Sequence, residues 1–130
     1  MQEILQIPDW SDKTILIAED MDDNFMVVSA LLKKTNVKII RAFNGNEAVA
    51  KASEHPEIDA ILMDISMPQM DGIEATRLIR MQYPGKAIIA QTAHEMYSQQ
   101  EKMKQEGCND YLLKPIRRNI LIETLSKYLS

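Results

Sequence analysis

The sequence predicts one α/β domain built on a doubly wound, five-stranded parallel β-sheet. Three observations favour this fold class. Short apolar segments alternate along the chain with longer amphipathic ones, which is typical of repeated βα units. The short segments are almost continuously apolar, as expected for strands covered by helices on both faces. The length of 130 residues suits a single domain with its own buried core.

Five strands are expected, because five apolar segments have the length and the β-branched content of strands. They are residues 14–18, 38–42, 60–63, 87–90 and 111–113. Five helices are expected to follow the strands in turn. The first begins after Asn24, and the others cover residues 45–54, 72–81, 97–106 and 119–129. Asn24 and Asn119 are predicted to be N-caps, a position that Asn favours.

Residues 1–12 have no sustained hydrophobic period. They are predicted to be a lead-in or a linker remnant, so that the domain itself covers residues 13–130. Trp10 in this segment either docks on the domain or is exposed to solvent.

Composition narrows the classes of function. The formal net charge of −4 provides no basic face, so direct nucleic-acid binding is not expected. Cys108 is the single cysteine, which excludes an internal disulfide and favours a cytoplasmic setting. No apolar run is long enough to cross a bilayer, so no membrane contact is expected.

Polar side chains follow four of the five predicted strands. Glu19 and Asp20 follow the first strand, Asp64 the third, Thr92 belongs to the end of the fourth, and Lys114 follows the fifth. The second strand is expected to deliver nothing comparable. Because ligands bind outside the carboxyl ends of the strands in such sheets, these side chains are expected to form one site.

The chemistry of this set favours phosphoryl transfer. Three carboxylates in one place repel each other, and a hard divalent cation such as Mg²⁺, which prefers oxygen ligands, relieves that repulsion. A lysine adds compact positive charge. A carboxylate can itself be the nucleophile and form an acyl phosphate. Asp64, central among the groups, is the predicted nucleophile.

These residues, in this order, resemble the response-regulator receiver domain of two-component signalling. The matching segments are Glu19-Asp20, Asp64 within residues 63–72, Thr92-Ala93, and Lys114-Pro115 at the end of residues 111–115. The resemblance covers nearly everything from Lys13 to Ser130. It implies a flavodoxin-like receiver fold with strand order 2-1-3-4-5 and five helices.

The resemblance also implies the metal site and the acceptor. Asp64 would accept a phosphoryl group from a phosphohistidine on a partner protein. Asp20, Asp64 and the backbone carbonyl of Ser66 would bind Mg²⁺, with Glu19 acting mainly through bound water. The domain would catalyse its own phosphorylation and dephosphorylation, with no turnover on external substrates.

The remaining roles implied by the resemblance concern the switch and the phosphate lifetime. Lys114 would pair with Asp64 and then with the phosphoryl group, across a cis Lys114–Pro115 bond. Thr92 would move to the phosphoryl group, and Tyr111 would then rotate inward. The small Ala93 would leave room for the phosphodonor, and we hypothesise that Ser66 and His94 tune the hydrolysis of the acyl phosphate.

Several segments, such as 91–94 and 107–116, resemble receivers attached to hybrid histidine kinases. Such a receiver would take its phosphoryl group from a kinase or a histidine phosphotransfer domain in a phosphorelay, and its parent chain would be a histidine kinase. A departure is Met21-Asp22-Asp23, where such receivers often have Asn after the acidic pair. A single-domain response regulator is the alternative, and a weak dimer is possible for either.

Two other classes of function compete with a phosphorylated receiver. A phosphorylation-independent binding module on the same fold usually lacks the acceptor or the lysine, whereas Asp64 and Lys114 are both present. A phosphatase of the aspartyl-phosphate type normally has a second acid two residues after the nucleophile. That position is Ser66, which argues against this class.

Overall fold

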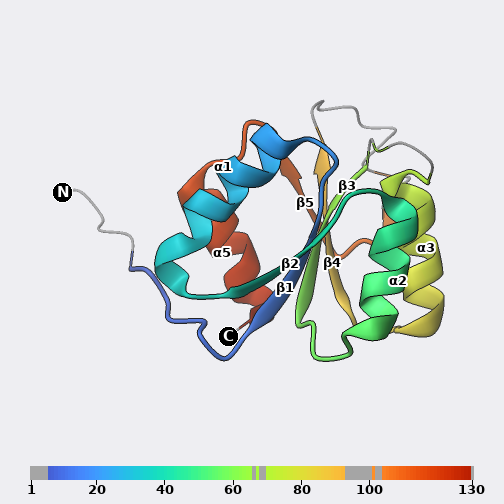
Figure 1. Cartoon of the computed structure of the whole chain (residues 1–130), viewed down its shortest axis with the longest axis horizontal. Helices are drawn as coiled ribbons and strands as arrows, with labels where there is room; N and C mark the ends of the chain where they lie inside the picture. Colours follow the sequence, from blue (N-terminus) through green and yellow to red (C-terminus); the bar gives the residue numbers. More distant parts are fainter. Residues whose placement is uncertain (1–5, 66, 68–69, 93–100, 102–103, 130) are drawn as a thin grey trace.

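The computed structural model describes residues 6–65, 67, 70–92, 101 and 104–129. The described residues form one five-stranded parallel sheet between two layers of helices (Figure 1). The strands are β1 Thr14–Ala18, β2 Lys38–Ala42, β3 Ala60–Asp64, β4 Ala87–Thr92 and β5 Asp110–Leu113. Their order is β2-β1-β3-β4-β5 and every neighbouring pair is parallel, which confirms the predicted sheet.

Helices cover both faces of the sheet. One face carries α1 Asp22–Leu32 and α5 Arg118–Leu129, and the other carries α2 Gly45–Glu54 and α3 Gly72–Gln82 (Figure 1). A 3₁₀ turn, Lys33–Thr35, follows α1. The described residues thus contain four α-helices instead of the five that were expected, because most of the predicted helix over residues 97–106 lies outside them.

The predicted N-caps were wrong at both helices. Met21 occupies the N-cap position of α1, and α5 begins at Arg118, so Asn24 and Asn119 lie inside their helices. The capping side chains are instead those of Asn44 before α2 and Asp71 before α3. Both accept a hydrogen bond from the backbone N–H three residues later, at 2.8 and 2.9 Å respectively.

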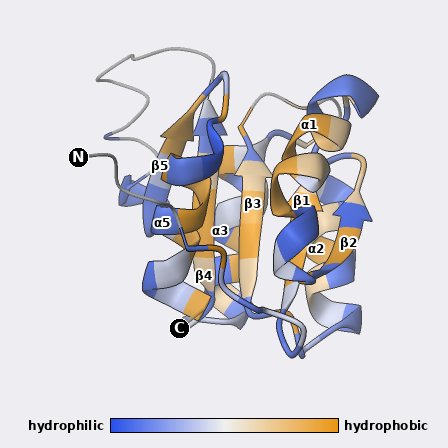
Figure 2. Cartoon of the chain, turned by 90° about the vertical axis from the view of Figure 1, so that its left-hand side faces the viewer, coloured by the Kyte–Doolittle hydropathy of each residue, from blue (hydrophilic) through white to orange (hydrophobic). Residues whose placement is uncertain are grey.

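The two faces of the sheet bury separate apolar clusters. On β3, Leu62 packs into the cluster under α1 and α5, while Ile61 and Met63 pack into the cluster under α2 and α3. Figure 2 shows β3 as an apolar strand over most of its length, between helices whose outer surfaces are more polar. Burial on both faces explains the continuous apolarity of the strand sequences.

The described part of the lead-in segment is anchored through Trp10. This side chain is only 3% exposed and belongs to the cluster under α1 and α5. The Trp10 N–H donates to the Thr35 carbonyl at 2.6 Å. Of the two alternatives for Trp10, the structure therefore shows the docked one. Among the described helices, none combines the length and the apolar character that crossing a membrane requires.

Candidate functional site

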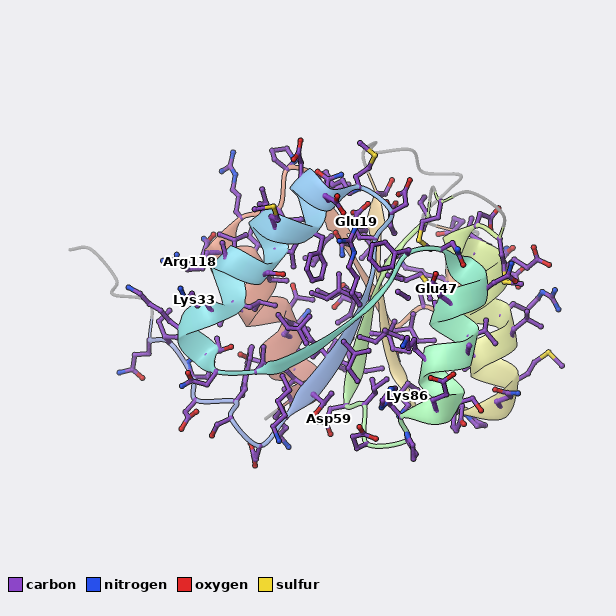
Figure 3. All side chains as sticks on the ribbon, in the orientation of Figure 1. Glu19, Lys33, Glu47, Asp59, Lys86 and Arg118 are labelled. Atoms are coloured by element: carbon purple, nitrogen blue, oxygen red, sulfur yellow. The ribbon has the colours of Figure 1, made fainter. Side chains whose placement is uncertain are left out.

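Two carboxylates lie buried at the carboxyl end of the sheet. Asp64 is the last residue of the central strand β3 and is 3% exposed, and Glu19, directly after β1, is 1% exposed. The neighbouring strand β2 holds the Glu19 backbone in place, since the Glu19 N–H donates to the Ala42 carbonyl at 2.9 Å. Figure 3 shows Glu19 at this end of the sheet and Asp59 at the opposite end.

Lys114 joins both carboxylates. Its Nζ lies 3.2 Å from Asp64 Oδ2 and 3.3 Å from Glu19 Oε1. The Lys114 backbone is fixed as well, because its N–H donates to the Thr92 carbonyl at 2.8 Å. One ammonium thus faces two buried carboxylates, so the site has an excess of negative charge.

Asp20 completes a cluster of three acids. One carboxylate oxygen from each of Glu19, Asp20 and Asp64 lies within 4.8 Å of the other two. Burial, together with a hydrogen bond to Asp64 and repulsion from its charge, raises the pKa of Glu19 to about 7. Hard oxygen donors with uncompensated negative charge, open to solvent through the partly exposed Asp20, are a donor set that fits Mg²⁺.

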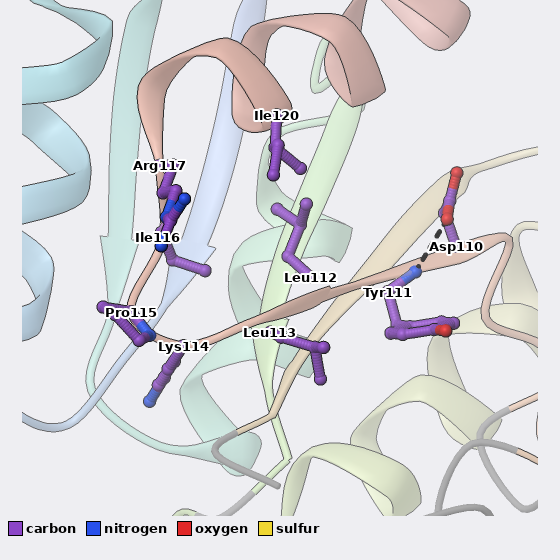
Figure 4. Close-up of a pocket in the computed structure, with 9 residues that line it drawn as sticks. All are labelled: Asp110, Tyr111, Leu112, Leu113, Lys114, Pro115, Ile116, Arg117 and Ile120. Atoms are coloured by element: carbon purple, nitrogen blue, oxygen red, sulfur yellow. Dashed lines mark hydrogen bonds between the residues drawn. The ribbon is translucent and has the colours of Figure 1, made fainter. Parts of the chain in front are cut away.

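Thr92 and Tyr111 lie on the strands beyond the acceptor strand. Thr92 ends β4 and is buried. Tyr111 on β5 is partly buried against a small cluster formed by Ile65 and Ala90. Figure 4 shows Leu112 directed toward Ile120 of α5, with Tyr111 on the other side of the strand. The ring of Tyr111 therefore packs toward the segment that follows β3.

The predicted site residues fall into three groups. The structure brings Glu19, Asp20, Asp64 and Lys114 into contact range. It places Thr92 on the adjoining strand end and Tyr111 one strand further away. The residues expected to tune the reaction and to complete the metal ligands, Ser66, Ala93 and His94, lie outside the described residues. The Lys114–Pro115 bond is cis, as the resemblance implies.

Sequence reasoning missed Arg41. The second strand was expected to deliver nothing to this end of the sheet, but the Arg41 guanidinium donates to the Glu19 carbonyl from Nε at 3.2 Å and from Nη2 at 3.0 Å. The only signal in the sequence was an arginine inside an apolar strand, two residues before Phe43.

Comparison with known proteins identifies the family. The protein-family model for the response regulator receiver domain matches residues 15–126 of this chain. The histidine-protein kinase BarA of Escherichia coli strain K12 is 40% identical over 118 residues, which cover 88% of this chain and 13% of BarA. The chain therefore spans only a small part of that relative. The response regulator DivK of Brucella anthropi is 37% identical over 119 residues, which cover 90% of this chain and 96% of DivK.

Solved structures show the same fold. The receiver domain of the sensor histidine kinase PA1611 from Pseudomonas aeruginosa PAO1, solved with a magnesium ion in its active-site cleft, matches with a TM-score of 0.82 and 37% identity. The match covers 90% of this chain and 97% of that one.

A second match is to a co-crystal structure of the Saccharomyces cerevisiae histidine phosphotransfer protein Ypd1 with the receiver domain of Ssk1. It has a TM-score of 0.84 and 28% identity, over 96% of this chain and 92% of that one. The family model covers most of the chain, and the sheet order and the acidic strand ends agree with it. The chain therefore belongs to the response regulator receiver domain family of two-component signalling.

Proposed function

We propose that this domain accepts a phosphoryl group on Asp64 from a phosphohistidine and changes its surface in response. The observation that carries the proposal is the pairing of a buried acceptor carboxylate with Lys114 at 3.2 Å, inside a cluster of three acids. In the transfer, an Asp64 oxygen attacks phosphorus, the P–N bond breaks, and the imidazole leaves with the bonding electrons and takes up a proton. The product is an acyl phosphate.

Glu19, Asp20, Asp64 and the Ser66 carbonyl are the residues that would hold Mg²⁺. When bound, the ion would neutralise charge on the carboxylate and phosphoryl oxygens. The magnesium ion in the active-site cleft of the PA1611 receiver supports this assignment. Lys114, which pairs with Asp64, would transfer its ion pair to the phosphoryl oxygens, because a lysine ammonium on a flexible stem can follow the charge with little rearrangement.

Thr92 and Tyr111 are proposed as the switch. A hydrogen bond from Thr92 to the phosphoryl group would draw the end of β4 toward Asp64, and the partly buried ring of Tyr111 would follow it inward. The movement would be a shift between two populated arrangements, with phosphorylation favouring one. Ser66, Ala93 and His94 are proposed to tune the lifetime of the acyl phosphate, and residues 97–106 to form the fifth helix.

The proposed partner is a phosphohistidine-bearing kinase or a histidine phosphotransfer domain in a cytoplasmic phosphorelay. The match to the Ssk1 receiver structure, which holds the phosphotransfer protein Ypd1, supports this class of partner. The likeness to BarA supports an origin in a hybrid histidine kinase. The likeness to DivK over 96% of its length favours a second candidate, a single-domain regulator. An immunoblot for the native polypeptide separates these two by size.

Mass spectrometry of the intact chain tests the function. Incubation with acetyl phosphate and Mg²⁺ is expected to add one phosphoryl group, which chelator and Asp64→Asn both abolish. Asp12→Asn, which changes an exposed aspartate in the lead-in, is the matched control and is expected to behave like the wild type. A wild-type chain that binds Mg²⁺ but takes no phosphoryl group would instead indicate a phosphorylation-independent binding module.

A further inference from the structure

We propose that Arg41 is a positioning residue that fixes the acidic loop between β1 and α1, residues 19–21, and thereby sets the affinity of the site for Mg²⁺. The identity of the metal rests on the proposed function, whereas the positioning of the loop rests on the contacts of Arg41. The guanidinium acts through the backbone carbonyl of Glu19 and through the side chain of Asp22.

Arg41 holds the first residue of this loop. Its Nε and Nη2 both donate to the Glu19 carbonyl, at 3.2 and 3.0 Å. The Glu19 N–H donates to the Ala42 carbonyl at 2.9 Å, so β2 holds the Glu19 backbone from two sides. The side chain of Glu19 then reaches Lys114 from a fixed backbone.

Arg41 also holds the residue that follows the loop. Its Nη1 lies 2.8 Å from Oδ1 of Asp22, the first residue of α1. One guanidinium therefore ties together the two residues that flank Asp20 and Met21. Since Asp20 is the partly exposed member of the acidic cluster, its position depends on these two flanking attachments.

Two aromatic rings pack against the guanidinium. Its Cζ lies 4.4 Å from the centroid of the Phe25 ring and 4.0 Å from that of Phe43. The Arg41 side chain is 15% exposed, so the rings shield most of it from water. A lysine would keep the charge but would lose the planar stacking and the paired donors.

The positioning role and a simple charge effect predict opposite signs. A cation beside an acidic site repels Mg²⁺, so removing that charge should strengthen metal binding if charge alone mattered. If Arg41 positions the loop, its loss should weaken metal binding instead. Arg41→Gln removes the charge, and Arg41→Lys keeps it, so both variants are needed.

The experiment measures Mg²⁺ affinity by titration calorimetry at constant ionic strength. Both Arg41→Gln and Arg41→Lys are expected to bind Mg²⁺ about 10-fold more weakly than the wild type, the low end of the loss seen when supporting residues of metal sites are removed. The matched control is Arg77→Lys, which changes an exposed arginine paired with Glu74 on α3 at 3.9 Å. Its affinity is expected to equal that of the wild type. Unchanged or tighter binding in the Arg41 variants would overturn the proposal.

A second readout uses the metal-free protein. Hydrogen exchange of the amides of residues 19–22 is expected to be faster in both Arg41 variants, with no change in the amides of β3. Equal protection in variant and wild type would also overturn the proposal. Asp22→Asn, which changes an exposed partner and leaves Arg41 in place, serves if the Arg41 variants do not fold. It is expected to show faster exchange in the same segment and a smaller loss of affinity.

Failure of this proposal is distinguishable from failure of the proposed function. If the wild type binds Mg²⁺ and is phosphorylated on Asp64 while the Arg41 variants match it, only the role of Arg41 is wrong. If the wild type itself takes up neither Mg²⁺ nor a phosphoryl group, the proposed function is wrong.

Discussion

At the scale of single residues, the carboxylates of the acidic cluster repel each other in the metal-free protein. Glu19 and Asp64 share one ammonium, and the pKa of Glu19 is raised to about 7 from a reference value of 4.5, mainly by burial and then by Asp64. Between these two pH values the folded state binds more protons than the unfolded state. The contribution of Glu19 to stability is therefore present below pH 4.5 and is lost as the pH rises toward 7.

The first prediction is that Glu19→Gln stabilises the metal-free protein at pH 8. Gln resembles the protonated acid, so the variant is expected to gain roughly 1–2 kcal/mol in the free energy of unfolding at pH 8 and little at pH 5. Urea unfolding in the presence of chelator measures both values. The same gain at both pH values would show that ionisation of Glu19 is not its cause.

A second residue-scale prediction concerns Gln91. Its side-chain oxygen and nitrogen are buried and make no hydrogen bond within the described part of the chain. Gln91 is one of the residues that line a cavity of about 110 Å³ between α1 and the segment after β5. Gln91→Met keeps the volume and removes the unpaired amide, so the free energy of unfolding is expected to rise by about 1 kcal/mol.

Gln82→Met, at an exposed position at the end of α3, is the control for this variant and is expected to change stability little. Chemical denaturation of both variants checks the comparison. A loss of stability in Gln91→Met would indicate that ordered water in the cavity satisfies the amide.

The sequence predicts which residues belong to the site where the fold alone brings them together. It does not predict residues whose role depends on particular side-chain contacts. The carboxyl ends of parallel strands meet at one edge, so Glu19, Asp64 and Lys114 could be predicted to converge. The role of Arg41 could not, because it depends on two aromatic rings and a backbone carbonyl that only the folded chain brings together.

At the scale of elements, two helices begin at glycines that allow very close packing. A Cβ on Gly72 would lie 2.1 Å from the carbonyl oxygen of Asp64, and one on Gly45 would lie 2.1 Å from that of Met70. The N-terminus of α3 is therefore packed directly on the backbone of the acceptor residue. The position of Asp64 and the start of α3 depend on each other.

We predict that Gly72→Ala lowers the free energy of unfolding by roughly 1–3 kcal/mol, because backbone atoms must move to admit the methyl group. It is also expected to slow phosphorylation, since the displaced backbone belongs to Asp64. Gly85→Ala is the matched control, because no atom lies within 4 Å of its Cβ position. Thermal unfolding and phosphorylation rates of both variants test this, and equal behaviour of the two would contradict it.

The element boundaries show where sequence reasoning succeeds. The strands and the helix over residues 45–54 were predicted to within two residues, because hydrophobic periodicity continues to the ends of these elements. The N-caps were predicted at Asn24 and Asn119 and proved to be elsewhere. Asn is frequent at caps but is tolerated in a first turn, and the backbone conformation decides between the two.

At the scale of the whole molecule, the described residues before β1 contribute to the core. Trp10 belongs to the apolar cluster under α1 and α5, and Ile7 packs on the same cluster. The boundary at residue 13, read from periodicity, could not reveal this, because one buried aromatic in an irregular segment produces no period.

We therefore predict that Trp10→Ala lowers the free energy of unfolding by about 3 kcal/mol, the cost of emptying a large buried site. The extent of phosphorylation in the folded fraction is expected to remain that of the wild type, because Trp10 lies by the amino end of β1 and Asp64 at the carboxyl end of β3. Circular dichroism during denaturation measures the first and intact-mass analysis the second. A variant as stable as the wild type would show that the segment contributes nothing.

The pairing of Lys114 with Asp64 has a consequence for biosynthesis. The two residues are 50 positions apart, and Lys114 follows the last strand of the sheet. During synthesis, Asp64 is therefore made before Lys114, the residue whose ammonium pairs with it. The site is therefore assembled only after synthesis has passed Lys114 and β5 has joined the sheet.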